Sequence, residues 1–599
     1  AADLARHFSE ASEWSKSLEY ARLAGARTQA LYAPRASIEQ YTRALFAAQQ
    51  LGEPTPQGLL LMRGQAYEML GEFTLAQADF EGALAQAEAD HDQTAEWNAL
   101  VCLGMLWAGR DYEKTGDYYR QALTLAETMG DRTLLARSLN RIGNWYVNHE
   151  EPVEGQQRHH EALAIMEASG DSAGVAETCD FLGMAYLLGA DLVQSADYCQ
   201  RAISLYRAAN QQQGLSSNLT TLGLCGLSYQ CAPLTPASLP VAPQSYAEEA
   251  IRIAQTIGYR SGEAYAYFCL GCILGPQGMW GAALKAMQSS LAIAQEIEHR
   301  QWTCAALTGL NCIFDDLLDL DAARRFGEQA LEIATAIGSQ HWLHCAAGFL
   351  VSTSVRQGDL VRAEAVLRAC GVTGTSVTTL GEHLLGRALI ELLLARHAFA
   401  EALTAVDNLI AHTPNAALDH HAPTVALLRG KTLAANGRTA EAEACLQAGI
   451  TSAQTLNNQT ILRSLYVELG RLYRRERRHD ELAQTLRKGE ALTQRLAAAI
   501  TDQAQREMFR ARALAALPAA PAYTQRQTVK QRYGGLTLRE SEVARSIAQG
   551  KSNKAIAEQF VVSERTIESH VSNILSKLGF ATRTQIAAWA VAQGLIENT

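Results

Sequence analysis

The sequence predicts an all-α protein: a long array of helical hairpins followed by a small domain of four short helices. Two observations lead to this fold class. A pattern of small and large residues recurs about every 40 residues through most of the 599-residue chain, and the last 64 residues contain four successive helix-start signals. We therefore expect one very long and one very short domain, although the length alone suggests about four domains of roughly 150 residues each.

The repeated unit has a small lead residue, then large, small, small, large and small residues at +3, +7, +12, +16 and +19. Its first clear copy consists of Gly64, Tyr67, Gly71, Ala76, Phe80 and Ala83. The lead residues stand at positions 64, 104, 143, 183, 223, 271, about 310, 351, 390, 430 and 470. Small first and fourth residues let the two helices of one hairpin approach closely. The large second and fifth residues are expected to fill the groove between neighbouring hairpins.

This order of residues resembles the tetratricopeptide (TPR) repeat, with a spacing near 40 instead of the usual 34 or so. HEAT and armadillo repeats share the longer spacing and remain the structural alternative, while the small and aromatic residues favour TPR. The resemblance implies a TPR-like α-solenoid over residues 1–504 that senses a signal or holds a partner.

One step between lead residues, from Gly223 to Gly271, is 48 residues long. The extra residues carry four of the 13 prolines, at positions 233, 236, 240 and 243. Because proline cannot continue a helix interior, we expect a loop that protrudes between two helices. It is either a neutral insertion or a functional loop that faces a ligand or partner. The surrounding stretch, residues 208–247, has no charged residue but is too rich in polar residues and proline to span a membrane.

The C-terminal segment, residues 536–599, carries a start signal for each of four helices. Thr537 with Glu540 and Thr582 with Gln585 form capping boxes, which open the first and fourth helices. Ser552 caps a second helix over 553–560, and Ser563 caps a third that ends at Gly579. Val561 and Val562 form the turn between these two. The third helix has an apolar face, made up of Ile567, Val571, Ile574, Leu575 and Leu578.

The opposite face of this third helix carries short polar side chains, a pattern that suits insertion in the major groove of DNA. The segment also resembles the LuxR/GerE-type helix-turn-helix domain nearly end to end, over about 64 residues. Three motifs carry the resemblance: Leu536-Thr537-Leu538-Arg539-Glu540-Ser541-Glu542-Val543, then Ser552-Asn553-Lys554-Ala555-Ile556-Ala557 with Ser563-Glu564-Arg565-Thr566-Ile567-Glu568-Ser569-His570, and Ile574-Leu575-Ser576-Lys577-Leu578-Gly579.

The resemblance implies that the third helix recognises double-stranded DNA. Residues that match Glu568, Ser569 and Ser572 face base edges in that family, and those that match Asn553, Lys554, Thr566 and Lys577 lie near phosphates. Arg565 and Asn573 complete the predicted DNA-binding set on the exposed face. Two residues depart from the family pattern: Glu568 stands where lysine is frequent, and Leu538 where proline is frequent. A carboxylate at 568 could accept a hydrogen bond from a cytosine amino group.

The formal net charge of −10 is divided unequally along the chain. Residues 505–599 hold 13 basic and 7 acidic groups, which leaves 39 basic and 55 acidic groups in residues 1–504. The acidic array should therefore stay off DNA. Residues 505–535 predict a flexible basic linker, and it carries most of the basic excess, since residues 536–599 have 7 basic and 6 acidic groups.

Other motifs predict no chemistry, so we expect no enzyme, cofactor or metal site in this chain. Gly430-Lys431-Thr432 lacks the earlier glycine of a phosphate-binding loop, because Val425 stands there. Cys269 and Cys272 have no second cysteine pair to complete a metal site. His341, His344 and Cys345 lack a nearby carboxylate in the sequence, and His570 is more typical of packing than of catalysis. The 12 scattered cysteines predict reduced thiols in a cytoplasmic protein.

A TPR-like array joined to a LuxR-type domain resembles the C-terminal part of the MalT-like, large ATP-binding LuxR regulators. This implies a DNA-binding transcriptional regulator whose array senses a small-molecule inducer or a protein, and which forms a homodimer on DNA. The fourth helix, with Ile586, Trp589 and Ala590, is either domain core or partly a dimer contact. The chain starts at Ala1 and has no ATPase motif, so we expect a fragment or a variant without that domain. The alternative is a TPR scaffold with secondary DNA binding.

Overall fold

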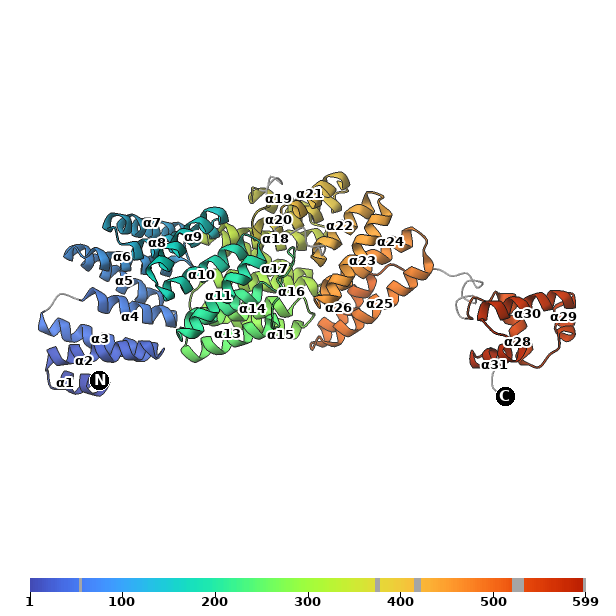
Figure 1. The fold of residues 1–599 in the computed structure, drawn as a ribbon, viewed down its shortest axis with the longest axis horizontal. Helices are drawn as coiled ribbons and strands as arrows, with labels where there is room; N and C mark the ends of the chain where they lie inside the picture. Colours follow the sequence, from blue (N-terminus) through green and yellow to red (C-terminus); the bar gives the residue numbers. More distant parts are fainter. Residues whose placement is uncertain (53–55, 372–376, 414–421, 520–532, 596–599) are drawn as a thin grey trace. The chain divides into compact units, whose positions relative to one another are not determined.

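The computed structural model describes residues 1–52, 56–371, 377–413, 422–519 and 533–595 (Figure 1). Every regular element in these ranges is an α-helix, so the predicted all-α class is confirmed. The chain divides into two compact units, Ala1–Pro518 and Ala519–Thr599, which are described separately. None of the described helices combines the length and apolar composition that crossing a bilayer requires.

In the described ranges of the first unit, consecutive helices pack antiparallel and most are joined by short turns, and the longest fully described connection lies between α12 and α13. The helices are α1 (Ala2–Glu10), α2 (Trp14–Ala30), α3 (Pro34–Leu51), α4 (Gln57–Leu70), α5 (Phe73–Asp90), α6 (Gln93–Trp107), α7 (Tyr112–Met129), α8 (Arg132–Asn148), α9 (Pro152–Ser169), α10 (Ser172–Leu188), α11 (Leu192–Ala208), α12 (Gln212–Leu224), α13 (Pro243–Ile257), α14 (Arg260–Leu274), α15 (Trp280–Glu296), α16 (Arg300–Asp316), α17 (Leu320–Ile337), α18 (Gln340–Gln357), α19 (Leu360–Ala369), α20 (Leu380–Ala395), α21 (Phe399–Ala411), α22 (Pro423–Ala435), α23 (Thr439–Thr455), α24 (Gln459–Arg475), α25 (His479–Ala498) and α26 (Gln503–Ala515).

All the predicted lead positions fall in the first helix of a pair, from α4/α5 to α24/α25, which confirms the helical-hairpin repeat. The lead glycine marks the closest approach of the two helices. A Cβ atom added to Gly104 would lie 2.3 Å from the Tyr119 ring, and one on Gly64 would lie 2.5 Å from the Phe80 ring. In these two hairpins the large fifth residue therefore packs on the lead residue. Phe80 also lies in one apolar cluster with Ala99, Cys102 and Leu103 of α6, so it contacts the neighbouring hairpin as well, as predicted.

The third position of the unit has a backbone reason of its own. Gly71 and Gly278 have φ values of 80° and 78°, and Glu150 and Ala190 at the same position have 66° and 65°. The turn between the two helices thus needs one left-handed residue, which glycine adopts without a steric penalty. The sequence indicates only that the residue at this third position is usually small.

The array extends beyond the predicted repeats at both ends. Helices α2 and α3 form an earlier hairpin, in which a Cβ atom on Gly25 would lie 2.5 Å from the Tyr41 ring. At the other end, α26 packs on α25, and the fully buried Phe509 ring meets Trp280 with centroids 4.9 Å apart. The flexible linker predicted from residue 505 therefore differs from the structure up to residue 515, because this apolar contact holds α26 on the array. Residues 520–532 of the predicted linker lie outside the described residues.

The array is wound so that segments far apart in sequence touch. The Gln301 N–H donates to the Gly109 carbonyl at 3.0 Å, and Arg110 donates to the Ile297 carbonyl at 2.9 Å, across 187 residues. Further along, the Gln459 N–H donates to the Pro276 carbonyl at 2.9 Å. Figure 1 shows α26 on the same side of the array as α14 and α15. In this way the turns of one stretch bind the helix starts of a stretch about five hairpins later.

Glu150 makes the most polar of these long-range contacts. Its buried carboxylate lies 3.5 Å from His341 Nδ1 and 3.6 Å from His344 Nδ1, and it accepts a hydrogen bond from the Thr379 hydroxyl. A Cβ atom on Gly381 would lie 2.4 Å from the same carboxylate, so the glycine leaves room for it. The carboxylate that the sequence around His341 lacks is thus supplied by α8–α9. Even so, no group of three or more ligating side chains among the described residues is arranged to hold a metal ion.

The sequence predicts that the proline-rich segment between α12 and α13 protrudes, and the structure differs for its first half, residues 225–234, which is largely buried, whereas residues 238 and 240–242 are exposed. Cys225, Ser228, Cys231 and Leu234 are at most 1% exposed. The Tyr229 N–H donates to the Cys272 carbonyl at 3.1 Å, which ties the loop to α14. α12 ends at Leu224, before the first proline at position 233, and the absence of charge allows the first half of the loop to be buried.

The lead-glycine contact gives a direct test of the packing. We expect Gly104→Ala to destabilise the protein by about 1–3 kcal/mol, because the new methyl group overlaps the Tyr119 ring. Gly281→Ala in α15 is the matched control: it has no atom within 4 Å of the added Cβ and should stabilise by about 0.5–1 kcal/mol through helix propensity. Urea unfolding followed by circular dichroism measures both, and equal unfolding midpoints would contradict this packing.

Candidate nucleic-acid interface

The second unit contains four short helices, which begin where the sequence predicts. They are α28 (Leu538–Ala548), α29 (Asn553–Phe560), α30 (Glu564–Leu578) and α31 (Arg583–Ala592). Both predicted capping boxes are present, at Thr537 with Glu540 and at Thr582 with Gln585. Ser552 and Ser563 accept backbone hydrogen bonds at the starts of α29 and α30, and Gly579 ends α30 with φ 67°. The predicted helix starts and stops are thus confirmed.

A small apolar core sets the orientation of α30. Its Ile567 and Ile574 are fully buried against Val543 of α28, Ile556 of α29 and Ile586 of α31. Val571, Leu575 and Leu578 are partly buried around this core. Since the apolar side of α30 points inward, its polar side must point to solvent. Ile586 and Ala590 are fully buried, so these two residues of α31 belong to the core.

The turn between α29 and α30 is held by contacts on both sides. Val561 adopts φ 54° while its side chain is 90% exposed, a strained conformation for a β-branched residue. Arg539 of α28 stacks over the Phe560 ring at 3.9 Å and donates to the Phe560 carbonyl at 3.2 Å. Arg539 therefore holds the end of α29, where the turn begins, against α28.

Most of the predicted base-facing residues lie together on the exposed side of α30. Glu568, Ser569 and Ser572 are exposed along one stripe, with Arg565 and Asn573 beside them. The Ser569 hydroxyl donates to the Arg565 carbonyl at 3.1 Å, which leaves its lone pairs free to accept. Lys554 of α29 is exposed as well. This surface offers a carboxylate, hydroxyls, an amide and two cations to a partner.

Three of the residues predicted to lie near phosphates also hold the unit together. The Lys577 ammonium donates to both Glu540 oxygens, at 2.7 and 2.6 Å. Asn553 Oδ1 accepts from Arg583 at 2.6 Å, and the Thr566 N–H donates to the Ser563 hydroxyl at 3.2 Å. If Lys577, Asn553 and Thr566 contact phosphates, they do so while also making these structural contacts.

Glu540 and Arg583 hold the unit together, a role that the sequence does not indicate beyond the helix cap at Glu540. Burial alone would raise the pKa of Glu540, but hydrogen bonds from Lys577 and Thr537 lower it below its ordinary value of 4.5. Arg583 also donates to the Lys551 carbonyl at 2.7 Å, and burial lowers its pKa. For both residues, the only sign in the sequence was a charged side chain without an obvious partner of opposite charge nearby.

Comparison with known proteins assigns this unit. The family described as "Bacterial regulatory proteins, luxR family" matches residues 535–590. Residues 535–590 form a LuxR-type helix-turn-helix domain. The uncharacterized transcriptional regulatory protein YhcZ of Bacillus subtilis is 52% identical over 66 residues, 11% of this chain and 31% of YhcZ. The nitrate/nitrite response regulator NarL of Escherichia coli is 34% identical over 91 residues, 15% of this chain and 42% of NarL.

The family match covers residues 535–590, and the chain spans about a third of the length of the first relatives that it matches. Among solved structures, a chain of the APC/C hetero-tetramer Cut9–Hcn1 aligns over 96% of both chains, with a TM-score of 0.41 and 12% identity. Because this similarity is low, the repeat architecture of the first unit is established by its own helix packing instead.

The Glu540–Lys577 pair provides a test of how α30 is held. We expect Lys577→Met to destabilise the domain by about 1–3 kcal/mol, because it leaves a buried carboxylate unpaired. Since the pKa of Glu540 is lowered, the pair stabilises fully at neutral pH, and this contribution is lost as the pH falls through 4.5 and below. Hydrogen exchange of peptides from α28 and α30 in the full chain measures the loss. The exposed Lys554→Met is the control, and equal protection in both variants would contradict a structural role for Lys577.

Proposed function

We propose that this protein is a sequence-specific DNA-binding regulator of transcription and that α30 is its recognition helix. The observation that carries the proposal is the exposed polar stripe of Glu568, Ser569 and Ser572 on the third helix of a LuxR-type domain. Short hydroxyl and carboxylate side chains on a helix with a buried opposite face can reach base edges in the major groove. Exposed Arg565 and Lys554, with Asn553, Thr566 and Lys577, would contact phosphates and fix the position of the domain.

The repeat array is proposed to receive the signal. Its excess of acidic groups disfavours binding to DNA, so the basic C-terminal segment would make the DNA contacts. A small-molecule inducer or a protein bound to the array would act by favouring an arrangement in which two LuxR-type domains occupy adjacent half-sites as a homodimer. This places the protein in the cytoplasm with the DNA, without a catalytic or cofactor-dependent step of its own.

A scaffold function is the second candidate. The array is long, and its helices carry many exposed polar side chains, which suits binding of another protein. In that case DNA contact would be secondary. The two candidates differ in whether binding of a ligand or partner to the array changes DNA occupancy.

The recognition helix is tested by bulky substitution on its exposed stripe. We expect Ser569→Trp and Ser572→Trp each to abolish the specific footprint on DNA that the full chain selects from a random pool, because an indole cannot fit against the base edges. Gln593→Trp, exposed just after α31, is the control and should leave the footprint in place. Unchanged footprints for both serine variants would exclude α30 as the recognition helix.

The phosphate contact of Lys554 makes a different prediction. Lys554→Met should weaken binding to all sequences about equally and reduce the slope of log K against log salt by about one, because one fewer counterion is released. Glu568→Gln keeps the size of the side chain and should instead alter the preferred base at one position. Binding measured over a series of salt concentrations separates the two effects. A changed base preference with an unchanged salt slope in Lys554→Met would contradict the assignment.

A further inference from the structure

A cavity of about 700 Å³ lies between the proline-rich loop and the hairpin of α22 and α23. This volume is within the range of about 300–1,000 Å³ that small-molecule sites occupy in proteins. Ala426 and Leu433 of α22 line it and are at most 3% exposed, and Ala448 and Gly449 of α23 and Pro236 of the loop line it as well. Its walls are therefore mostly apolar, and they come from segments far apart in the chain.

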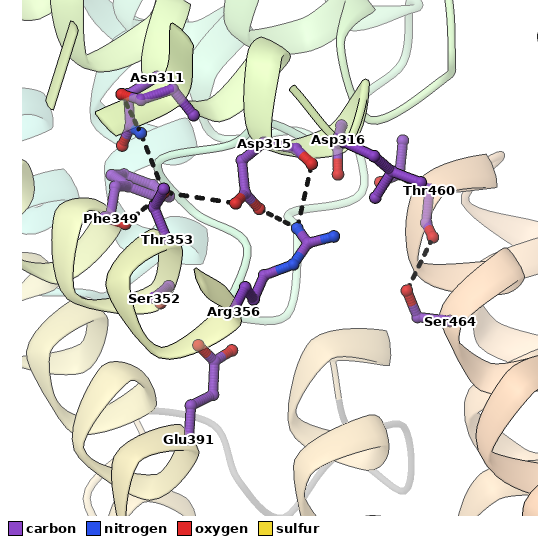
Figure 2. Close-up of polar contacts among 12 residues, drawn as sticks. Asn311, Asp315, Asp316, Phe349, Ser352, Thr353, Arg356, Glu391, Thr460 and Ser464 are labelled. Carbon is purple, nitrogen blue, oxygen red and sulfur yellow. Dashed lines mark hydrogen bonds and ion pairs between the residues drawn. The ribbon is translucent and has the colours of Figure 1, made fainter. Parts of the chain in front are cut away.

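The loop side of this cavity is anchored by buried polar contacts. The Tyr229 N–H donates to the Cys272 carbonyl at 3.1 Å, and the Tyr229 hydroxyl donates to Asp316 at 2.6 Å. Figure 2 shows Asp316 beside Asp315, whose carboxylate accepts a hydrogen bond from Arg356. Because these groups satisfy one another, the loop wall is in place without a ligand, and a pre-formed wall lowers the cost of binding.

Two charged side chains, Arg429 and Glu441, line the cavity. The Glu441 carboxylate is already paired, since Arg438 donates to both of its oxygens, at 2.7 and 2.6 Å. Arg429 is held less firmly. Its Nη2 lies 3.9 Å from Asp407 Oδ1, and its Nε makes no hydrogen bond to a described residue. Because the Arg429 side chain is 34% exposed, a ligand in the cavity can reach it, and the cavity therefore favours an anion.

We propose that this cavity binds a small apolar molecule with one carboxylate, the chemistry of a medium-chain fatty acid. Its carboxylate would pair with Arg429, and its apolar chain would lie against Ala426, Leu433 and Ala448. A single arginine matches the one charge of a carboxylate better than the two charges of a phosphate monoester. The proposal names the ligand class for the sensor role of the array and rests on that part of the proposed function.

A ligand in this cavity would connect two parts of the array. Pro236 and Ala426 both line it, although they are 190 residues apart in the sequence. Binding would favour the arrangement in which the loop and the hairpin of α22 and α23 enclose the cavity over any in which they separate. The cavity would thus give the array a ligand-dependent contact between its middle and its C-terminal hairpins.

Calorimetric titration of the full chain with octanoate tests the proposal. Octanoate should bind with a Kd of about 1 mM or below, and octylammonium, 1-octanol and butanoate should each bind at least about tenfold more weakly. The first two lack the anion, and butanoate lacks four of the methylene groups. Failure of octanoate to bind, or equal binding of any of the three, would overturn the proposal. A footprint on DNA without added ligand, from the same preparation, tests the DNA-binding function independently.

Arg429→Met tests the carboxylate contact. It should weaken octanoate binding at least about tenfold and leave 1-octanol binding unchanged, because only the carboxylate loses its partner. A loss of folding would weaken both, so the ratio of the two affinities separates recognition from stability. Arg474→Met, at an exposed position of α24, is the control and should bind octanoate like the original chain. An unchanged octanoate affinity in Arg429→Met, or an equal loss for both ligands, would overturn the proposal.

Ala448→Trp tests the cavity itself. Ala448 is exposed on α23 and lines the cavity, so an indole there would fill the space of the ligand without entering the packed core. Octanoate binding should be lost while the Tm of the ligand-free protein is unchanged. Ala491→Trp, at an exposed position of α25, is the matched control and should bind like the original chain. Octanoate binding by Ala448→Trp with the original affinity would place the ligand elsewhere and overturn the proposal.

Discussion

Contact between segments nearly 190 residues apart is the constraint on which the first unit depends. A helical repeat array needs only nearest-neighbour packing to form, and in most such arrays the interior of the superhelix is open to solvent. Here the turns of early hairpins donate to and accept from the helix starts of later ones, as Arg110 does with Ile297 and Glu150 with Thr379. These contacts join early hairpins to late ones, and part of the loop after α12 and the Glu150 carboxylate are buried in the array.

Much of the fold was predictable from short-range signals. Lead glycines such as Gly104 identify the hairpins because close helix approach tolerates no side chain there, and Thr537 and Ser563 identify helix starts because they cap free N–H groups. The interior was not predictable in the same way. Nothing near Glu150 in sequence shows that it will meet His341, and the loop after α12 could be recognised as buried only from its lack of charge.

The DNA-facing surface shows the same division. The exposed stripe on α30 follows directly from helical periodicity, so Ser569 and Ser572 were located correctly on the solvent side. Whether they contact bases remains a prediction. The pairing of Lys577 with Glu540 was not foreseeable, because it joins residues 37 positions apart through a tertiary contact.

The winding of the array also has a consequence for synthesis. The carboxylate of Glu150 leaves the ribosome long before Thr379 and the histidines that partner it, with about five hairpins still to be made. During that interval the early hairpins can form locally, but a charge destined for burial remains in water, and the surfaces that will close the interior stay exposed. The complete packing of the N-terminal part is thus decided by residues translated much later, and a chain that stops before them would carry an unfinished interior.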